Sequence, residues 1–241
     1  METEITVLVS SSPIPSHPSL AIIQETLDSI RYHLPDAKII IMLDGVREEQ
    51  KDREKAYHQH IMQLATKLLA SKDRQVRLYP FNDFTHQAWM TMKTLETIYS
   101  PLILFVEHDT PLVDKPIDWP LLKRMIREGY TNHIRLHYDE QIHPEHQHLM
   151  RGKLTENLIK TVQWHQRPHL AHATWYEQIL ANNFTEKSRT WIEDKVYSPV
   201  TCAPWEEYKL TVYDPEGTGQ NMKRSRDLNG RAGDKKYDPQ F

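Results

Sequence analysis

Short apolar runs and segments with helical periodicity alternate along the first half of the chain. The runs are rich in β-branched residues and too short for helices, so they predict buried strands. These strands cover residues 5–11, 38–43, 75–81 and 101–109. The segments between them place apolar residues on one helical face, which predicts helices at 20–34, 48–71 and 85–100, the last with Thr85 as its N-cap.

Strands separated by helices predict an α/β architecture: a Rossmann-like, mostly parallel central sheet flanked by helices. In open sheets of this kind, ligands bind outside the carboxyl ends of the strands. Asp44 follows the second predicted strand, whereas Glu107 and Asp109 end the fourth. We therefore expect these carboxylates to share one crevice.

The second half of the chain has a less regular pattern and predicts a smaller C-terminal subregion. Its predicted elements are a helix at 116–129 that ends at Gly129, a strand at 133–138, a hairpin of 160–165 and 169–175 around Gln166-Arg167-Pro168, helices at 174–183 and 186–198, and a strand at 208–214. We expect residues 1–214 to form one domain with halves at 1–115 and 116–214. Residues 215–241, which are basic and contain glycines, are expected to be a loop-like tail.

Composition narrows the class of protein. The 241 residues are 39% hydrophobic and 26% charged, with a net charge of −3 and a pI near 6.5, which gives no electrostatic case for nucleic-acid binding. A single cysteine, Cys202, excludes an internal disulfide and a cysteine zinc cage. The sequence has neither a secretory signal pattern nor a transmembrane run, so we expect a cytoplasmic protein; peripheral membrane attachment stays open, and oligomeric state is unknown.

The acids that follow the apolar run at 102–106 carry the strongest chemical signal. Mg²⁺ and Mn²⁺ bind carboxylate oxygens and complete their coordination with water and substrate phosphates. Glu107 and Asp109, at the mouth of a buried strand, meet that requirement. The alternative is a strand-end carboxylate that caps a turn with Thr110 and Pro111.

The order of these features resembles that of the GT-A nucleotide-sugar glycosyltransferases, close to the family-2 type, over roughly residues 4–200. The resemblance rests on the strand that ends in Asp44-Gly45 and on the acid-x-Asp motif Glu107-His108-Asp109. It implies that Asp109 binds the metal ion, Mn²⁺ or Mg²⁺. Glu107 stands where Asp is usual, so it is expected to contact the donor.

The same resemblance implies how a nucleotide-sugar donor would be held. Asp44 matches the acid that holds the nucleobase, with an ordinary Asp-Gly turn as the alternative. The loop at 10–15, which includes Ser11 and Pro13, matches the segment that wraps the base. In the tail, Arg231 is expected to contact the diphosphate, because arginine forks suit phosphate oxygens.

A second acidic motif, Ile192-Glu193-Asp194, resembles the x-Glu-Asp motif of inverting GT-A enzymes. An inverting transfer needs one carboxylate to take the proton of the acceptor hydroxyl. We assign that role to Asp194 and an acceptor-orienting role to Glu193; a surface acid pair beside Arg189 or Lys195 is the alternative.

Residues 164–176 mix aromatic rings with histidines and are a candidate acceptor wall. Sugar rings stack their C–H faces on aromatic rings while their hydroxyls bind polar groups. His165, His172 and Trp175 are therefore candidate acceptor contacts. A packed hairpin with hydrogen-bonded histidines is the alternative.

The resemblance therefore implies a glycosyltransferase of the hexosyltransferase type that moves a sugar from a nucleotide-diphosphate donor, expected to be UDP-linked, to a glycan or other hydroxyl acceptor with inversion. One alternative is a nucleotidyltransferase of the same fold, although the loop at 10–19 lacks the glycines and basic residues typical of that class. Another is a non-catalytic carbohydrate- or protein-binding module. Acceptance of the sugar by a nucleic-acid base is disfavoured by the acidic net charge.

Overall fold

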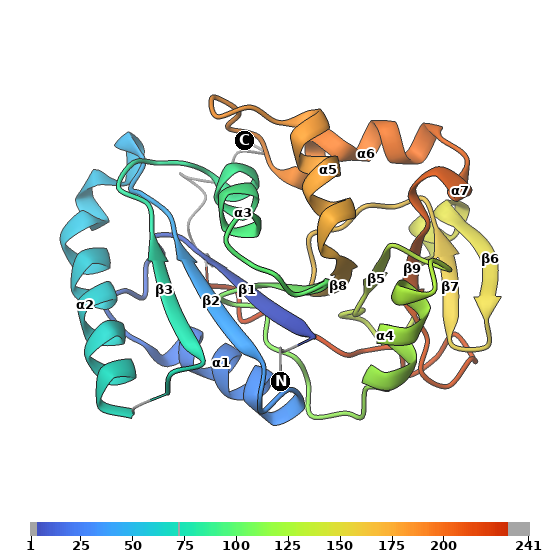
Figure 1. Cartoon of the computed structure of the whole chain (residues 1–241), viewed down its shortest axis with the longest axis horizontal. Helices are drawn as coiled ribbons and strands as arrows, with labels where there is room; N and C mark the ends of the chain where they lie inside the picture. Colours follow the sequence, from blue (N-terminus) through green and yellow to red (C-terminus); the bar gives the residue numbers. More distant parts are fainter. Residues whose placement is uncertain (1–3, 72, 231–241) are drawn as a thin grey trace.

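The computed structural model describes residues 4–71 and 73–230 and has a nine-stranded sheet at its centre (Figure 1). The strand order is β3-β2-β1-β4-β8-β5-β9-β7-β6. The strands are β1 (Ile5–Ser11), β2 (Lys38–Leu43), β3 (Val76–Pro80), β4 (Leu102–Glu107), β5 (His133–Arg135), β6 (Met150–Thr155), β7 (Leu158–Thr161), β8 (His169–His172) and β9 (Leu210–Tyr213).

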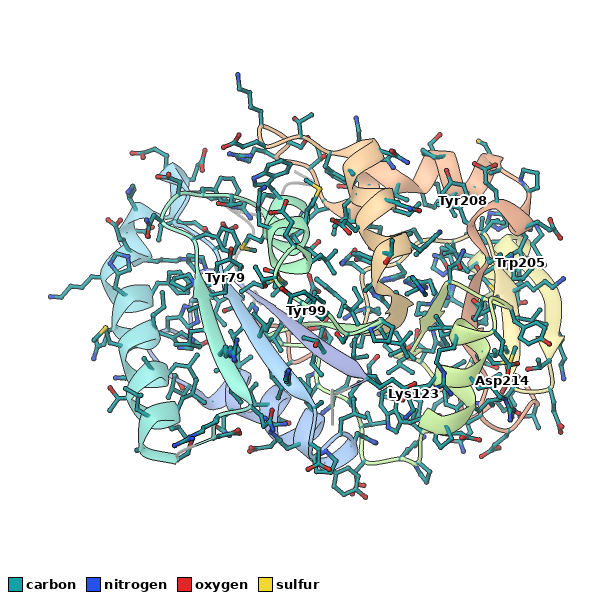
Figure 2. All side chains as sticks on the ribbon, viewed as in Figure 1. Tyr79, Tyr99, Lys123, Trp205, Tyr208 and Asp214 are labelled. Carbon is teal, nitrogen blue, oxygen red and sulfur yellow. The ribbon has the colours of Figure 1, made fainter. Side chains whose placement is uncertain are left out.

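Helices cover both faces of the sheet. Those described are α1 (Ala21–His33), α2 (Glu54–Ser71), α3 (Gln87–Leu95), α4 (Trp119–Arg127), α5 (Ala173–Asn183), α6 (Ile192–Cys202) and the short α7 (Trp205–Tyr208), with 3₁₀ turns η1 (Glu48–Arg53) and η2 (Pro144–Leu149). The core divides accordingly: α1, α2 and α4 pack on one face, and α3, α5 and α6 pack on the other. In Figure 2, Tyr79 on β3 lies toward one edge of the molecule, and Trp205 and Tyr208 of α7 lie toward the other.

The alternation of side chains along β4 decides where its terminal acid points. Leu104 belongs to the core cluster under α1 and α4, whereas Ile103 and Phe105 belong to the cluster under α3 and α5. Successive side chains of a strand point to opposite faces. Glu107 therefore follows Ile103 and Phe105 onto the α3 face, where Gln87, the first residue of α3, donates a 2.9 Å hydrogen bond to it.

The two halves of the chain meet where β8 lies beside β4. Strands β1 to β4 pair in parallel, as the sequence predicts, but β8 runs antiparallel to both β4 and β5. Phe105 pairs with His169 in this register. The loop that enters β8 therefore lies beside the end of β4 that carries Glu107.

The predicted hairpin around Gln166-Arg167-Pro168 is wrong. Strand β7 pairs with β6 and β9, whereas β8 is inserted between β4 and β5. The physical reason is burial: Leu170 and Ala171 are fully inaccessible, so β8 is covered by strands on both sides. The hairpin of this region is formed by β6 and β7 instead.

Two predicted helix starts also differ from the structure. Thr85 is not the N-cap of α3, because its amide donates to Asp44 and its hydroxyl donates to Asp83, which leaves His86 as the cap residue. The helix predicted from residue 186 begins at Ile192. Residues 185–188 form a turn, in which the Ser188 amide donates to the Thr185 carbonyl at 2.9 Å.

The part of the tail that the structure describes crosses the carboxyl end of β4. The amides of Arg226 and Leu228 donate to Pro111 and Asp109, and the amide of Arg224 donates to His137 beyond β5. Residues 221–230, the strap hereafter, thus join the two halves of the sheet. Among residues 4–71 and 73–230, no helix has the length and apolar character needed to cross a bilayer.

Candidate active site

A cavity of about 450 Å³ opens at the carboxyl ends of β1, β2 and β4, a size that suits a small-molecule ligand. Strand ends, the loop before β8, the start of α6 and the strap all contribute to its wall. The lining residues are Ser10, Ser12, Asp44, Arg47, His86, Gln87, Glu107, His108, Asp109, His165, Gln166, Arg167, Trp191, Glu193, Asp194, Asp227 and Asn229. Carboxylates that are remote in sequence therefore share one cavity, as the rule for open α/β sheets predicts.

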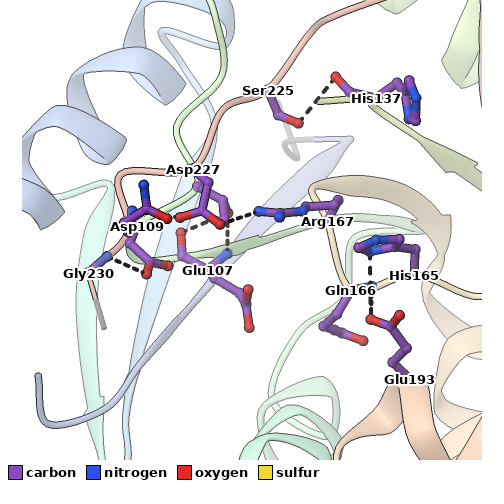
Figure 3. A network of polar contacts seen from close by, with 12 residues as sticks. Glu107, Asp109, His137, His165, Gln166, Arg167, Glu193, Ser225, Asp227 and Gly230 are labelled. Carbon is purple, nitrogen blue, oxygen red and sulfur yellow. Dashed lines mark hydrogen bonds and ion pairs between the residues drawn. The ribbon is translucent and has the colours of Figure 1, made fainter. Parts of the chain in front are cut away.

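Asp109 is held at the cavity by a turn and by the strap. The turn closes through Thr110, whose amide donates to the Glu107 carbonyl at 3.0 Å. Asp109 Oδ2 accepts a 3.2 Å hydrogen bond from the Gly230 amide (Figure 3). A Cβ atom at position 230 would lie 2.8 Å from this oxygen, so a larger residue there would require the Asp109 carboxylate to shift.

Asp44 holds the loop before α3. Its Oδ1 accepts hydrogen bonds from the amides of Gly45 at 2.8 Å and Thr85 at 2.7 Å, and both carboxylate oxygens lie 3.2 Å from the His86 amide. Burial raises the pKa of Asp44 to about 6, while these amides and Arg47 act in the opposite direction. Asp44 is therefore a buried acceptor whose charge changes near neutral pH.

Glu193 and Asp194 lie in the first turn of α6 and both line the cavity. Glu193 accepts a 3.2 Å hydrogen bond from the Gln166 amide, which fixes the loop before β8 (Figure 3). Burial raises the pKa of Glu193, and the charge of Asp194 adds to that effect, whereas the Gln166 amide and Arg135 oppose it. His165 lies 3.6 Å away, but burial lowers its pKa to about 2, so the contact involves a neutral imidazole.

Arg135 places a buried positive charge beneath this acid pair. It is 2% exposed and donates to Gln163 at 3.1 Å, and no carboxylate of the described residues lies within ion-pair distance of it. Burial lowers its pKa to about 10, and the charge of Glu193 partly offsets that effect. The guanidinium is thus charged at neutral pH and acts on Glu193 at a distance.

The sequence did not reveal Arg167 and Asp227 as site residues. Arg167 lies in the loop before β8 and donates to Asp227 of the strap at 2.8 Å, with its guanidinium 4.4 Å from the ring centre of Tyr138 (Figure 3). Its position follows from the pairing of β8 with β4, which brings it beside Glu107. Because that pairing joins strands more than 60 residues apart, no local pattern indicated it.

The other predicted site residues are distributed as follows. Ser11 and Pro13 flank the lining residue Ser12 but are themselves buried. Ser11 ends β1 beside Leu43 of β2, and the Pro13 carbonyl accepts a hydrogen bond from Gln50 of η1. His172 and Trp175 lie at the far end of β8, where His172 pairs with Leu102 and caps α5, so they do not line the cavity. Arg231 lies outside the described residues.

The described side chains of the site provide carboxylate oxygens for a metal ion, but they do not form a complete coordination site. Within the described part of the chain, no group of three or more His, Cys, Asp or Glu side chains is arranged to hold a metal ion. Asp109, with Glu107 and Asp227 nearby, nevertheless fits a hard cation that takes one or two carboxylates and completes its shell with phosphate oxygens and water.

No protein-family model matches the sequence, and no curated protein matches it by sequence either. Solved structures do match. TarS from S. aureus (residues 1–349) has a TM-score of 0.58 at 10% identity over 93% of this chain and 60% of its own. GalNAc-T7, solved with UDP, GalNAc and Mn²⁺, has a TM-score of 0.60 at 9% identity over 95% of this chain and 44% of its own.

A cytidylyltransferase from Leptospira borgpetersenii has a TM-score of 0.51 at 13% identity, over 94% of this chain and 82% of its own. The chain therefore has a GT-A-like fold, and it spans less than two thirds of the matched TarS and GalNAc-T7 chains. At such identities the likeness extends to the fold, and the chemistry has to be argued from the site.

Proposed function

We propose that this chain is a metal-dependent glycosyltransferase that moves a sugar from a nucleoside-diphosphate donor to a hydroxyl acceptor. The observation that carries the proposal is the gathering of Asp44, Asp109 and Asp194 on one cavity at the carboxyl ends of the parallel strands. GalNAc-T7, a structural neighbour, binds UDP and Mn²⁺, which supports the same ligand class here.

In the donor half, Asp44 would accept a hydrogen bond from an N–H group of the nucleobase. Its Oδ1 lies within hydrogen-bond distance of three backbone amides and its Oδ2 only of the His86 amide, so Oδ2 is the more available oxygen. One available acceptor suits uracil, whose N3–H is a single donor, and this favours a UDP-sugar. Ser12, which lines the cavity between Ser11 and Pro13, would lie against the base.

Asp109 would hold Mn²⁺ or Mg²⁺, with Glu107 as a contact to the donor. When bound, the cation supplies positive charge to the departing diphosphate. Arg167 adds a fixed guanidinium at the same end of β4, and arginine forks suit phosphate oxygens. Arg167 is thus a described residue for the diphosphate role that the sequence suggested for Arg231.

In the acceptor half, Asp194 would take the proton of the acceptor hydroxyl as its oxygen attacks the anomeric carbon. The bond from that carbon to the diphosphate breaks on the opposite side, so the sugar configuration inverts. Glu193 holds the Gln166 amide and would orient the acceptor. His165 is a neutral hydrogen-bonding group on the same wall.

Two substitutions test this assignment. Asp194→Asn should lower turnover by about 10²–10⁴-fold and leave donor affinity unchanged, because only the proton acceptor is lost. Asp109→Asn should abolish the Mn²⁺-dependent part of UDP binding. Glu145→Gln is the control, since its side chain is 82% exposed and lies outside the cavity.

Binding is read from thermal shifts with UDP, GDP and CTP, each with and without Mn²⁺, and turnover from release of the nucleotide product. A glycosyltransferase releases a nucleoside diphosphate from the sugar nucleotide, whereas a nucleotidyltransferase releases pyrophosphate from a nucleoside triphosphate. Turnover that survives Asp194→Asn would remove the base assignment, and no response to any nucleotide would remove the proposal.

A further inference from the structure

A row of aromatic side chains leads outward from the cavity. Trp191 and His86 line the cavity with ring centres 4.9 Å apart, and Phe84 lies edge-on to His86 at 5.7 Å. These three residues, the aromatic shelf, come from the loop before α3 and the start of α6. Trp191 and Phe84 are partly exposed, so the shelf offers ring surface to a ligand.

Two guanidinium groups converge on the outer end of the shelf. Arg47 and Arg189 lie 5.0 Å and 5.5 Å from the ring centre of Phe84. Arg47 also acts on Asp44, whose pKa it lowers. Arg189 is therefore the cation that the outer end of the shelf offers to an anion.

Arg189 in particular has no acidic partner within the part of the chain that the structure describes. It is exposed, and its Nη1 donates to the carbonyls of Glu186 at 2.6 Å and Ser188 at 3.0 Å. These neutral acceptors hold the side chain in place without neutralising it. Only Nη1 of Arg189 has an acceptor among the described residues, and a guanidinium fork matches a carboxylate or phosphate.

The shelf lies next to the proposed catalytic base in the chain. Trp191 is the N-cap residue of α6, and Glu193 and Asp194 occupy the first turn of that helix. An acceptor whose hydroxyl reaches Asp194 would therefore place its neighbouring ring on Trp191 and His86. Its more distant part would reach Phe84 and the two arginines.

We infer that the aromatic shelf and Arg189 form an acceptor subsite for an anionic saccharide, one that carries a carboxylate or phosphate away from the reacting hydroxyl. Sugar C–H faces would stack on the rings, and the anionic group would bind the Arg189 guanidinium. The inference rests on the proposed glycosyltransferase function and adds the class of acceptor. It also assigns to Trp191 and His86 the stacking role that the sequence suggested for Trp175 and His172.

The test measures saccharide binding to the full chain by calorimetry, with and without UDP and Mn²⁺. The probes are trigalacturonate, maltotriose as its neutral counterpart, and mannose 6-phosphate with mannose as its counterpart. We expect at least tenfold tighter binding of one charged probe than of its neutral counterpart. The charged probe that binds decides between a carboxylate and a phosphate.

Two variants separate the parts of the subsite. Arg189→Gln should weaken the charged probe about tenfold and leave the neutral one unchanged, with Arg151→Gln, an exposed arginine on β6, as the matched control. Trp191→Leu should weaken both probes and leave UDP binding intact, which also shows that the variant is folded. Trp191→Phe, which keeps a ring, should restore most of the binding.

The outcomes distinguish this inference from the proposed function. If UDP binds but no charged saccharide does, or if Arg189→Gln changes nothing, the subsite is overturned and the transferase proposal stands. If charged saccharides bind in an Arg189-dependent way but no nucleotide does, the saccharide site stands. The proposed transfer then fails, and the acceptor role with it.

Discussion

Single residues of the candidate site show how burial changes the protonation of a carboxylate. Asp44 has a raised folded-state pKa of about 6 because burial disfavours its charge more than the surrounding amides favour it. For a carboxyl group, a raised pKa means that the folded protein takes up a proton as the pH falls through about 6. The hydrogen bond that Asp44 is proposed to accept from the nucleobase requires the ionised form.

Donor affinity should therefore fall as the pH drops below about 6. The expected slope is about tenfold per pH unit, which corresponds to about 1.4 kcal/mol. The measurement is calorimetric titration with UDP and Mn²⁺ between pH 5 and 7.5. In Asp44→Asn this fall in UDP affinity should disappear. An identical pH dependence in that variant would assign the titration to another group.

Arg135 should control the protonation of Glu193. Removing its charge in Arg135→Met takes away an effect that lowers the pKa of Glu193, so this pKa rises further. If Glu193 must be ionised for transfer, the acid limb of the rate profile moves to higher pH. Stability should change by less than about 2 kcal/mol, because the lost Gln163 hydrogen bond is offset by relief of a buried charge.

The control for this prediction is Arg151→Met, an exposed arginine remote from the acid pair. The measurements are the pH profile of turnover and chemical denaturation of each variant. A profile that moves to lower pH, or that does not move, would contradict the effect that Arg135 is predicted to have on the pKa of Glu193.

At the scale of elements, one glycine packs the end of β2 against the loop before α3. Gly45 follows β2, and a Cβ atom there would overlap the backbone of Asp83 and Phe84. Gly45→Ala should therefore push the loop before α3 outward and cost about 1–3 kcal/mol. Because that loop carries the amides that bind Asp44, UDP affinity should fall as well.

Gly129→Ala provides the matched control. Gly129 has a φ of +74° after α4, and an added Cβ would meet no atom within 4 Å. Its cost is only that of the left-handed conformation, about 1–2 kcal/mol, and UDP affinity should not change. Denaturation and calorimetry measure both effects, and equal UDP affinities in the two variants would contradict the role given to Gly45.

Elements with a local signal were predicted well from the sequence. The apolar runs at 5–11, 38–43 and 101–109 gave the parallel strands, because such runs are buried on both faces. The start of α3 was missed because Asp44, remote in sequence, binds the amides of Thr85 and His86. The hairpin was wrong because the partners of β8 depend on the tertiary fold.

The residues of the candidate site likewise comprise some that a local motif indicates and some that only the tertiary fold brings there. Asp44, Glu107, Asp109, Glu193, Asp194 and His165 line the cavity, and all are candidates that the sequence motifs or the family resemblance suggested. Arg167, Asp227 and Trp191 were not, because nothing in their local sequence indicates which strand end they approach. His172 and Trp175, also candidates for the acceptor wall, lie at the other end of β8, away from the cavity.

At the scale of the whole molecule, the strap fastens the two halves together. Met222 is fully buried with Ile142 and Val212, and Ser225 donates to the Leu136 carbonyl at 2.9 Å. Met222→Ala should lower the free energy of unfolding by about 2–5 kcal/mol, as expected for a core cavity. Urea denaturation measures this loss.

Arg226→Ala is the control for the strap. Arg226 pairs with Glu25, but both side chains are about half exposed, so the loss should be below about 1 kcal/mol. If Met222→Ala cost no more than this control, the strap would not contribute to the fold beyond surface contacts.

The antiparallel pairing of β8 with β4 decides which segments face each of the two proposed substrates. The residues proposed to bind the nucleotide lie at strand ends before residue 110. Arg167, in the loop before β8, is the one added contact, to the diphosphate. Everything proposed to read the recipient comes from that loop, from the start of α6 and from the short stretch before α3. Under this proposal, substitutions at the start of α6 would change the recipient and leave Asp44 and Asp109 in place, whereas substitutions before α3 would also disturb the amides that bind Asp44.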